Sequence, residues 1–182
     1  EPALSDRDLA VVIVNYHTAE LLAACLASLR DGGLAGLAAT VWVVDNHSPD
    51  DSVTRARATL PGVEIIANSA NTGYAAANTL ALAAAGFGPG RSGAGYRHAL
   101  LLNPDTLVPA GALARLVALL DAEPDVGVVG PKLLLPDGRV LVHNLTPSLA
   151  NWLCELNPDD PQLRPRTTPR GDDASRPTHH AP

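Results

Sequence analysis

Polar side chains able to bind a ligand follow each of four short apolar segments in this sequence. They are amides and carboxylates, which exchange hydrogen bonds with a polar ligand and whose oxygens can hold hard cations. Asn and Asp are common in turns, which would explain any one of them, whereas a shared binding site explains the whole set better. The set comprises Asn15, Asp45, Asn46, Asn68, Asn71, Asn103 and Asp105.

Two members of this set are carboxylates with different expected chemistry. Asp45 can accept a hydrogen bond from the imide N–H of a uracil or thymine ring, which would select a pyrimidine. A turn cap for residues 46–52 explains the same residue equally well. Asp105 is a hard oxygen ligand for Mg²⁺ or Mn²⁺, and such a cation would neutralise the charge on a departing nucleoside diphosphate. Because one carboxylate makes a weak metal site, the phosphates of the substrate would have to supply much of the coordination.

The apolar segments that precede these residues have the length of strands. The continuous β-branched run at residues 9–14 is typical of a strand buried on both faces of a parallel sheet. Further strands are predicted at residues 41–44, 63–66, 99–102 and 126–129. Pro136-Asp-Gly138 predicts a turn between residues 133–135 and 140–142, as in a hairpin.

Helical stretches alternate with these strands. Thr18 is the expected cap of the first helix, and Asp51 or Ser52 is the expected cap of the second. A third helix is predicted at residues 75–85, and a fourth carries Leu113, Leu116, Val117 and Leu120 on one stripe. Strands that alternate with helices predict a three-layer α/β/α sandwich with a mostly parallel sheet. In such sheets ligands bind beyond the carboxyl ends of the strands, where the polar set lies.

Familiar nucleotide and nucleophile motifs are missing from the expected places. The turn after the first strand has no glycine, which argues against a dinucleotide-binding unit. A formal G-x-G-x-x-G at residues 88–93 follows a helix and precedes a strand, the reverse of the required context, so we expect a flexible loop. The sequence has no P-loop lysine motif and no G-x-S-x-G elbow. Asn-x-Ser/Thr sequons at Asn46 and Asn144 have little meaning without a secretory context.

Composition limits the class of protein further. The chain has 182 residues, which fits about one domain. Its net charge of −6 argues against nucleic acid as a partner. No apolar run approaches the roughly 20 residues of a membrane span. Cys25 lies on an apolar helical stripe and is expected to be an inert core thiol. Residues 155–182 are rich in proline and charge and predict a disordered tail, which leaves residues 1–154 as the folded domain.

Five ordered motifs resemble those of family 2 glycosyltransferases, which have the GT-A fold. The similarity is closest to the rhamnosyltransferase-like branch and extends from about Leu9 to Arg139. The motifs are VVIVNY at residues 11–16, VVDNHS at 43–48, NTGYAAAN at 71–78, LLNPDT at 101–106 and GPKL at 130–133.

The resemblance implies a role for each polar position at the strand ends. Two residues would line the base pocket, three would shape the wall near ribose and diphosphate, and two would stand where relatives carry Asp-x-Asp. A neutral amide replaces the first carboxylate of that Asp-x-Asp, which leaves one main metal ligand. These positions are Asn15 and Asp45, then Asn71, Gly73 and Asn78, then Asn103 and Asp105, with Asp105 as the metal ligand.

The implied activity is transfer of a sugar, with rhamnose as the candidate, from a UDP- or dTDP-sugar donor to a glycan or lipid-linked acceptor. Mg²⁺ or Mn²⁺ would assist departure of the nucleoside diphosphate. The family context implies cell-wall or polysaccharide biosynthesis, in the cytoplasm or in peripheral association with the inner face of the membrane.

A second interpretation stays open because the acceptor side is not matched. Family members continue with an acceptor-binding part and a carboxylate general base, which an inverting transfer needs to deprotonate the acceptor hydroxyl. The similarity fades after Arg139, and no later carboxylate has a matching context. We therefore assign no catalytic residue and expect a chain truncated on the acceptor side. The alternative is a nucleotide-sugar-binding fragment without turnover.

Overall fold

The computed structural model describes residues 7–93 and 95–140. The chain divides into two units, residues 1–131 and residues 132–182, and the helices and strands given below belong to the first. The predicted disordered tail, the boundary at residue 154 and the sequon at Asn144 lie outside the described residues. Within the described ranges, no helix combines the length and apolar character needed to cross a membrane.

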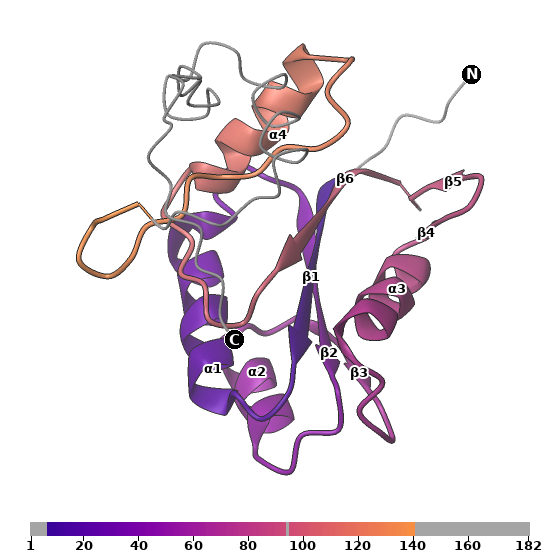
Figure 1. Ribbon diagram of the computed structural model, residues 1–182, viewed down its shortest axis with the longest axis vertical. Helices are drawn as coiled ribbons and strands as arrows, with labels where there is room; N and C mark the ends of the chain where they lie inside the picture. Colours follow the sequence, from indigo (N-terminus) through magenta and orange to yellow (C-terminus); the bar gives the residue numbers. More distant parts are fainter. Residues whose placement is uncertain (1–6, 94, 141–182) are drawn as a thin grey trace, which may run out of the picture. The chain divides into compact units, whose positions relative to one another are not determined.

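A four-stranded parallel sheet forms the centre of the first unit (Figure 1). Its order is β3-β2-β1-β6, so the first strand of the chain lies between the second and the last. The bounds are β1 Arg7–Asn15, β2 Ala39–Asp45, β3 Glu64–Ala67 and β6 Tyr96–Leu102. The prediction of a mostly parallel sheet is confirmed, and each of these four strands overlaps the segment predicted for it.

Helices cover both faces of this sheet, which confirms the three-layer sandwich. In Figure 1, α1 and α2 lie on one side of β1 and β2, and α3 lies on the other. Helix α4 contributes Leu113 and Val117 to the same buried cluster as α1. The bounds are α1 Ala19–Ser28, continued by the π-helical turn η1 Leu29–Gly33, α2 Ser52–Thr59, α3 Tyr74–Ala84 and α4 Ala112–Ala122.

Alternate side chains of β1 supply the two halves of the core. Val11 and Ile13 are fully buried against the α1 side, whereas Val12 is fully buried against Ala77 and Ala81 of α3. Burial of one such side chain contributes about 1.5–3 kcal/mol, so a strand buried on both faces holds the two helical layers together. This two-sided burial explains why the sequence at residues 9–14 is continuously apolar rather than alternating.

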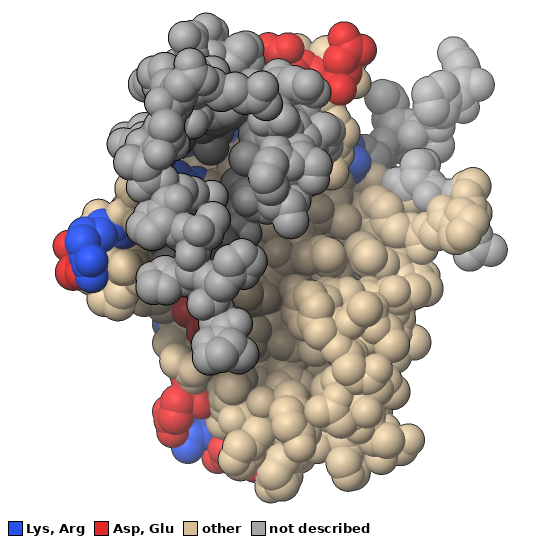
Figure 2. Space-filling model, in the orientation of Figure 1, with Lys and Arg blue, Asp and Glu red and all other residues tan. Residues whose placement is uncertain are grey.

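The outer face of α3 carries no charged side chain. Residues 65–90 contain no Asp, Glu, Lys or Arg, and Figure 2 shows a broad uncharged surface on the side of the molecule where α3 lies. Leu80 is 43% exposed and Tyr74 is 51% exposed on this helix. The charges of the described residues therefore gather on other elements.

One predicted strand is not found in the structure. Residues 126–129 do not form a strand, and Val128 is 56% exposed. β-Branched residues favour a strand only where a neighbouring strand offers hydrogen-bond partners, and none pairs with this segment among the described residues.

In the second unit, the hairpin turn is confirmed by the antiparallel bridge between Leu134 and Val140 and by the hydrogen bond from Leu135 N to Arg139 O at 2.8 Å.

The glycine-rich segment at residues 88–93 is more ordered than predicted. It forms an antiparallel pair of short strands, β4 Phe87–Gly88 and β5 Arg91–Ser92. The ring of Phe87 stacks on Tyr96, with ring centroids 6.3 Å apart. Gly93, whose φ is +97°, lies against the ring of Phe87. A Cβ atom there would stand 2.7 Å from Phe87 Cζ, so the close approach requires glycine.

The Gly93→Ala variant should therefore be less stable than the unsubstituted chain by about 2 kcal/mol, because a left-handed alanine is strained and its methyl group displaces the Phe87 ring. Gly90→Ala is the matched control, since Gly90 has a φ of +70° but open space at its Cβ position. Urea denaturation followed by circular dichroism measures both. Equal losses in the two variants would contradict the contact with Phe87.

An ion-pair network ties the first residues of β1 to β6 and α4. Arg97 donates to Asp8 at 2.6 Å and to Asp121 at 2.5 Å, and His98 Nε2 lies 2.9 Å from Asp121. The backbone N–H of Ala38, followed by Arg97, holds the pKa of Asp8 below its ordinary value. The hydrogen bond with His98, followed by the contact with Arg97, does the same for the pKa of Asp121.

These lowered pKa values predict the acid response of the fold. A carboxylate whose pKa is lower in the folded state contributes stability above its unfolded pKa of about 3.9, and that contribution is lost as the pH falls through the folded value. The unfolding free energy of Arg97→Gln should therefore fall less steeply between about pH 5 and pH 2 than that of the unsubstituted chain. Arg115→Gln, which changes an exposed arginine of α4, should leave the slope unchanged. Parallel curves for all three proteins in denaturant titrations would refute the role of Arg97.

Candidate functional site

Strand register brings the first predicted site residues together. Asn15 at the end of β1 is aligned with Asp45 at the end of β2, and Asp45 is aligned with Ala67 at the end of β3. Because the strands are parallel, their carboxyl ends meet at one edge of the sheet, which we call the carboxyl edge. Strand β6 ends at Leu102, opposite Ile13, so Asn103 also follows at this edge.

Asn15 and Asp45 are buried and hydrogen-bonded to each other at the carboxyl edge. Asn15 Nδ2 donates to Asp45 Oδ1 at 2.9 Å and to Ser48 Oγ at 3.0 Å. Asn15 Oδ1 accepts from Thr18 Oγ1 at 2.7 Å. The backbone N–H of His17, which has a φ of +56°, donates to Ser48 Oγ at 2.9 Å. These bonds lock the β1–α1 turn to the turn after β2.

The contacts of Asp45 bear on the two interpretations of this residue. Its Oδ2 accepts from the backbone N–H of Ser48 at 3.0 Å, which is the turn-capping geometry. A carboxylate has about four acceptor sites, so two stay available after the bonds to Asn15 and Ser48. Only 5% of the residue is exposed. Asp45 therefore caps its turn, and a base contact at its remaining acceptor sites stays a prediction.

Asp50 binds the N-termini of two helices, a role that was predicted for Thr18 and for Asp51 or Ser52. Asp50 Oδ2 accepts from Ala19 N of α1 at 3.3 Å, and Oδ1 accepts from both the backbone N–H and the hydroxyl of Ser52 at the start of α2. Burial acts to raise the pKa of Asp50, but the hydrogen bonds from Ser52 and Ala19 and the nearby His17 outweigh it, so the pKa lies below its ordinary value.

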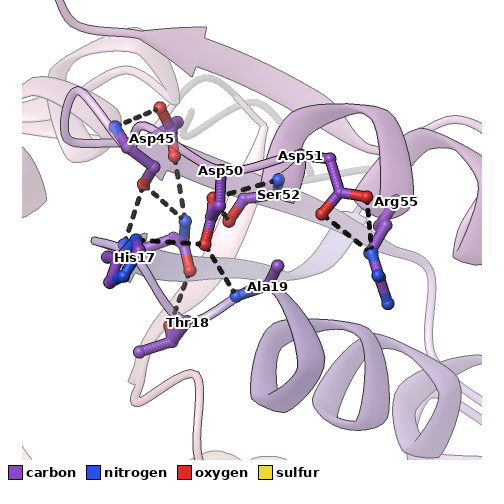
Figure 3. A network of polar contacts seen from close by, with 10 residues as sticks. His17, Thr18, Ala19, Asp45, Asp50, Asp51, Ser52 and Arg55 are labelled. Atoms are coloured by element: carbon purple, nitrogen blue, oxygen red, sulfur yellow. Dashed lines mark hydrogen bonds and ion pairs between the residues drawn. The ribbon is translucent and has the colours of Figure 1, made fainter.

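Thr18 and Asp51 occupy the predicted cap positions of α1 and α2, but the capping hydrogen bonds expected of their side chains are not made. Thr18 instead donates to Asn15, and Asp51 forms an ion pair with Arg55 at 2.9 Å on the exposed surface of α2 (Figure 3). Both residues stand next to a helix start, but it is the carboxylate of Asp50 that accepts from free N–H groups of both helices.

Asn46 organises the loop between β3 and α3 and was predicted only as one of the polar set. It is 2% exposed. Its Oδ1 accepts from Thr72 N at 3.0 Å and from Asn68 Nδ2 at 3.0 Å, and its Nδ2 donates to Asn71 Oδ1 at 2.7 Å. A buried amide with both ends occupied cannot accept a glycan, so the sequon that begins at Asn46 is not usable in the folded chain.

Three predicted site residues lie on this loop and on α3. Asn71 Oδ1 also accepts from Gly73 N at 2.9 Å, so Asn71 shapes the turn that begins the helix. Gly73 is exposed and has a φ of +81° as the residue before α3. Asn78 is 5% exposed, donates to Tyr74 O at 3.0 Å, and keeps its buried Oδ1 without a partner in the described part of the chain.

Asn103 connects the end of β6 to the start of α3. Its Oδ1 accepts from the hydroxyl of Tyr74 at 3.1 Å, although the two residues are far apart in the sequence. Its backbone oxygen accepts from Thr106 N at 3.3 Å and contacts Cys25 Sγ at 3.8 Å. The carboxyl edge thus brings the loop before α3 against the segment that contains Asn103 and Asp105.

The described residues fit a divalent cation only if the ligand supplies most of the coordination. Asp105 is exposed and offers one carboxylate. In the described ranges, no three His, Cys, Asp or Glu side chains are grouped so that they could hold a metal. A metal shared with substrate phosphates stays a prediction, and it rests on the habit of Mg²⁺ and Mn²⁺ of keeping phosphate or water ligands.

Cys25 lies under this edge and is fully buried, as predicted. Burial, followed by the negative charge of Asp105, raises the pKa of its thiol to about 12. A thiol with this pKa stays protonated at neutral pH, so it is not a nucleophile.

Solved structures with this arrangement are glycosyltransferases of the GT-A fold. TarS from S. aureus, solved as residues 1–349, matches with a TM-score of 0.51 and 18% identity over 70% of this chain and 39% of its own. A second TarS structure, in complex with UDP, matches with a TM-score of 0.51, 19% identity and coverage of 72% and 43%. The mannosyltransferase PcManGT from Pyrobaculum calidifontis, in complex with GDP-Man and Mn²⁺, matches with a TM-score of 0.54, 24% identity and coverage of 66% and 34%.

The chain belongs to glycosyl transferase family 2, whose model matches residues 10–144. This confirms the family and the fold that the five motifs indicated. The chain spans less than half the length of the solved structures that it resembles. No curated protein sequence matches it.

Replacement of Asn46 by alanine tests the organisation of the carboxyl edge. Asn46→Ala leaves the N–H of Thr72 without its acceptor, removes one of the two donors to Asn71 Oδ1 and empties a buried site, so stability should fall by about 2–4 kcal/mol. Asn68→Ala removes only one outer member of the network and should cost less than about 1 kcal/mol. Chemical denaturation measures both, and a mild effect of Asn46→Ala would show that water replaces the amide.

Proposed function

We propose that the chain binds a nucleotide-sugar donor at the carboxyl edge and takes part in transfer of its sugar. The proposed donor is a UDP- or dTDP-sugar, with rhamnose as the candidate sugar, and the proposed acceptor is a glycan or a lipid-linked saccharide. The observation that carries the proposal is that two hydrogen-bonded pairs lie at one edge of a parallel sheet in a chain of family 2. The pairs are Asn15 with Asp45 and Tyr74 with Asn103. The structural neighbours TarS and PcManGT were solved with UDP and with GDP-Man, and open parallel sheets bind ligands at this edge.

In this proposal, Asp45 recognises the base. Its turn-capping bonds hold the carboxylate in one orientation before a ligand arrives, which lowers the entropic cost of binding. The remaining acceptor sites can take the imide N–H of a pyrimidine in a charge-assisted hydrogen bond. Because the residue is nearly buried, the bond would form in a low-dielectric setting, where it is stronger than in water.

Asp105 is the proposed protein ligand of a divalent cation, which is Mg²⁺ or Mn²⁺. When bound, the cation supplies Lewis-acid stabilisation of the leaving nucleoside diphosphate. Support comes from the exposure of Asp105 and from PcManGT, whose structure contains Mn²⁺ and GDP-Man. Asn71 and Gly73 shape the loop that would pass near ribose and diphosphate, and Asn78 supports the helix that follows this loop.

Titration calorimetry with UDP, dTDP and GDP in MnCl₂ tests the donor site. UDP or dTDP should bind more tightly than GDP, and both Asp45→Ala and Asp105→Ala should weaken binding at least about tenfold, which is about 1.4 kcal/mol. Asp51→Ala, which removes a nearby exposed carboxylate outside the cluster, should bind like the unsubstituted chain. Thermal unfolding of each variant controls for loss of structure. Unchanged binding in both site variants would refute the assignment.

Turnover separates a transferase from a donor-binding fragment. Release of UDP or dTDP from the corresponding nucleotide sugars, measured by mass spectrometry with and without saccharide acceptors, is expected if the chain provides a general base. Donor binding without release would support the fragment interpretation instead.

A further inference from the structure

Strand β6 has one free edge in the described part of the chain. It is the last strand of the sheet, with β1 on one side and no strand on the other among residues 7–93 and 95–140 (Figure 1). The backbone N–H and C=O groups of a free edge can pair with a strand of another chain, and proteins commonly protect such an edge with proline, lysine or a bulge. The sequence of β6, YRHALLL, has no proline and no lysine, and its register with β1 is constant, without a bulge.

The pairing with β1 shows which backbone groups of β6 are free. Arg7 N donates to Gly95 O at 3.0 Å, so the backbone groups of Gly95 point toward β1. In a strand, the N–H and C=O groups point to one side at one residue and to the other side at the next. Every second residue after Gly95 therefore bonds to β1. The N–H and C=O groups that point away from β1 belong to Tyr96, His98, Leu100 and Leu102.

The permanent charge on this strand is already matched within its own chain. Arg97 donates to Asp8 at 2.6 Å and to Asp121 at 2.5 Å. The next two side chains with the same alternation, Ala99 and Leu101, are apolar and exposed, and 49% of Leu101 is exposed. The edge therefore offers backbone hydrogen bonds beside apolar side chains, and the partner that fits it is an extended, apolar strand without unpaired charge.

We propose that β6 pairs with β6 of a second copy of this chain, antiparallel and about a two-fold axis at Ala99. The strand itself has the properties that its free edge requires of a partner. In this register, Tyr96 pairs with Leu102 of the second copy and His98 pairs with Leu100, so the free groups of all four residues are used. The contact is isologous, since the same residues meet on both copies.

Side-chain sizes and charges fit this register. The pair on the axis is a non-hydrogen-bonded pair, whose Cα atoms approach to about 4.5 Å. Ala99, the smallest residue of β6, occupies this position on both copies. Arg97 faces Leu101 of the second copy, so no like charges meet across the axis. Leu100 of the second copy lies beside His98, at the apolar groove that residues of β6 and α4 line.

Sedimentation velocity between about 1 and 100 µM tests the association, because a contact through one strand is small and the dimer should be weak. The unsubstituted chain should change from monomer to dimer over this range. Ala99→Lys places two ammonium groups against each other at the axis and should raise the dissociation constant at least about fivefold. Leu80→Lys is the matched control, since Leu80 is 43% exposed on α3, and it should leave the dissociation constant unchanged.

Two results of this experiment would overturn the proposal. One is a monomer at every concentration of the unsubstituted chain. The other is a dimer that Leu80→Lys weakens and Ala99→Lys does not, which would place the contact on α3. Circular dichroism of both variants controls for loss of structure.

Oxidative cross-linking tests the register and decides the matter if Ala99→Lys does not fold. All variants carry Cys154→Ser, and Cys25 is buried. Ala99→Cys brings two thiols together at the axis, where the Cα separation of about 4.5 Å suits a disulfide. Leu101→Cys is the control on the same strand, because its two Cα atoms would lie about 13 Å apart along the strands.

A disulfide-linked dimer, measured by non-reducing electrophoresis, should form at least about fivefold faster in Ala99→Cys than in Leu101→Cys. Equal rates, or a faster reaction in Leu101→Cys, would overturn the proposed register. Neither measurement involves a nucleotide, so both outcomes are independent of the proposed donor site.

Discussion

The parallel register between β1 and β2 is the constraint on which the candidate site depends. It aligns Asn15 with Asp45, so that the carboxylate meets an amide donor as soon as the strands pair. A shift by one residue would move the side chains of a strand to the opposite faces of the sheet. The carboxylate of Asp45 would then lose its partner while staying buried, which costs several kcal/mol. The register is therefore set by the apolar core along the strands and by this polar pair at their end.

Neutral amides hold the loop before α3 in shape at this edge, whereas glycine and backbone groups shape phosphate-binding loops. Asn46 is buried; it accepts from Thr72 N and donates to Asn71 Oδ1, in a segment about 25 residues further along the chain. An amide can be buried at lower cost than a carboxylate, provided that both of its ends are hydrogen-bonded. The loop before α3 consequently has a defined shape without a glycine-rich sequence, and Tyr74 at its end is held close to Asn103.

The sheet could be predicted from sequence because its strands are continuous apolar runs, which few other structures explain. The strand predicted at residues 126–129 was wrong because β-branched composition says nothing about a pairing partner. The cap positions were predicted correctly, but the capping hydrogen bonds were not, because Asp50 accepts from Ala19 of α1 and from Ser52 of α2. The contact with α1 comes from a loop distant in the sequence and exists only after β1 and β2 have paired. The motifs identified the family, and the site residues that they indicate stay predictions. Their roles stay predictions, since side-chain geometry without a ligand does not define what each one binds.

Asp50 has an electrostatic consequence for the whole carboxyl edge. One carboxylate accepts from the first turns of both α1 and α2, so a single negative charge offsets the partial positive charges at two helix ends. Helix α3 begins at the same edge and has no acidic residue in its first turn. The starts of α1 and α2 therefore share one carboxylate acceptor, whereas the residue before α3, Gly73, donates to the neutral amide of Asn71.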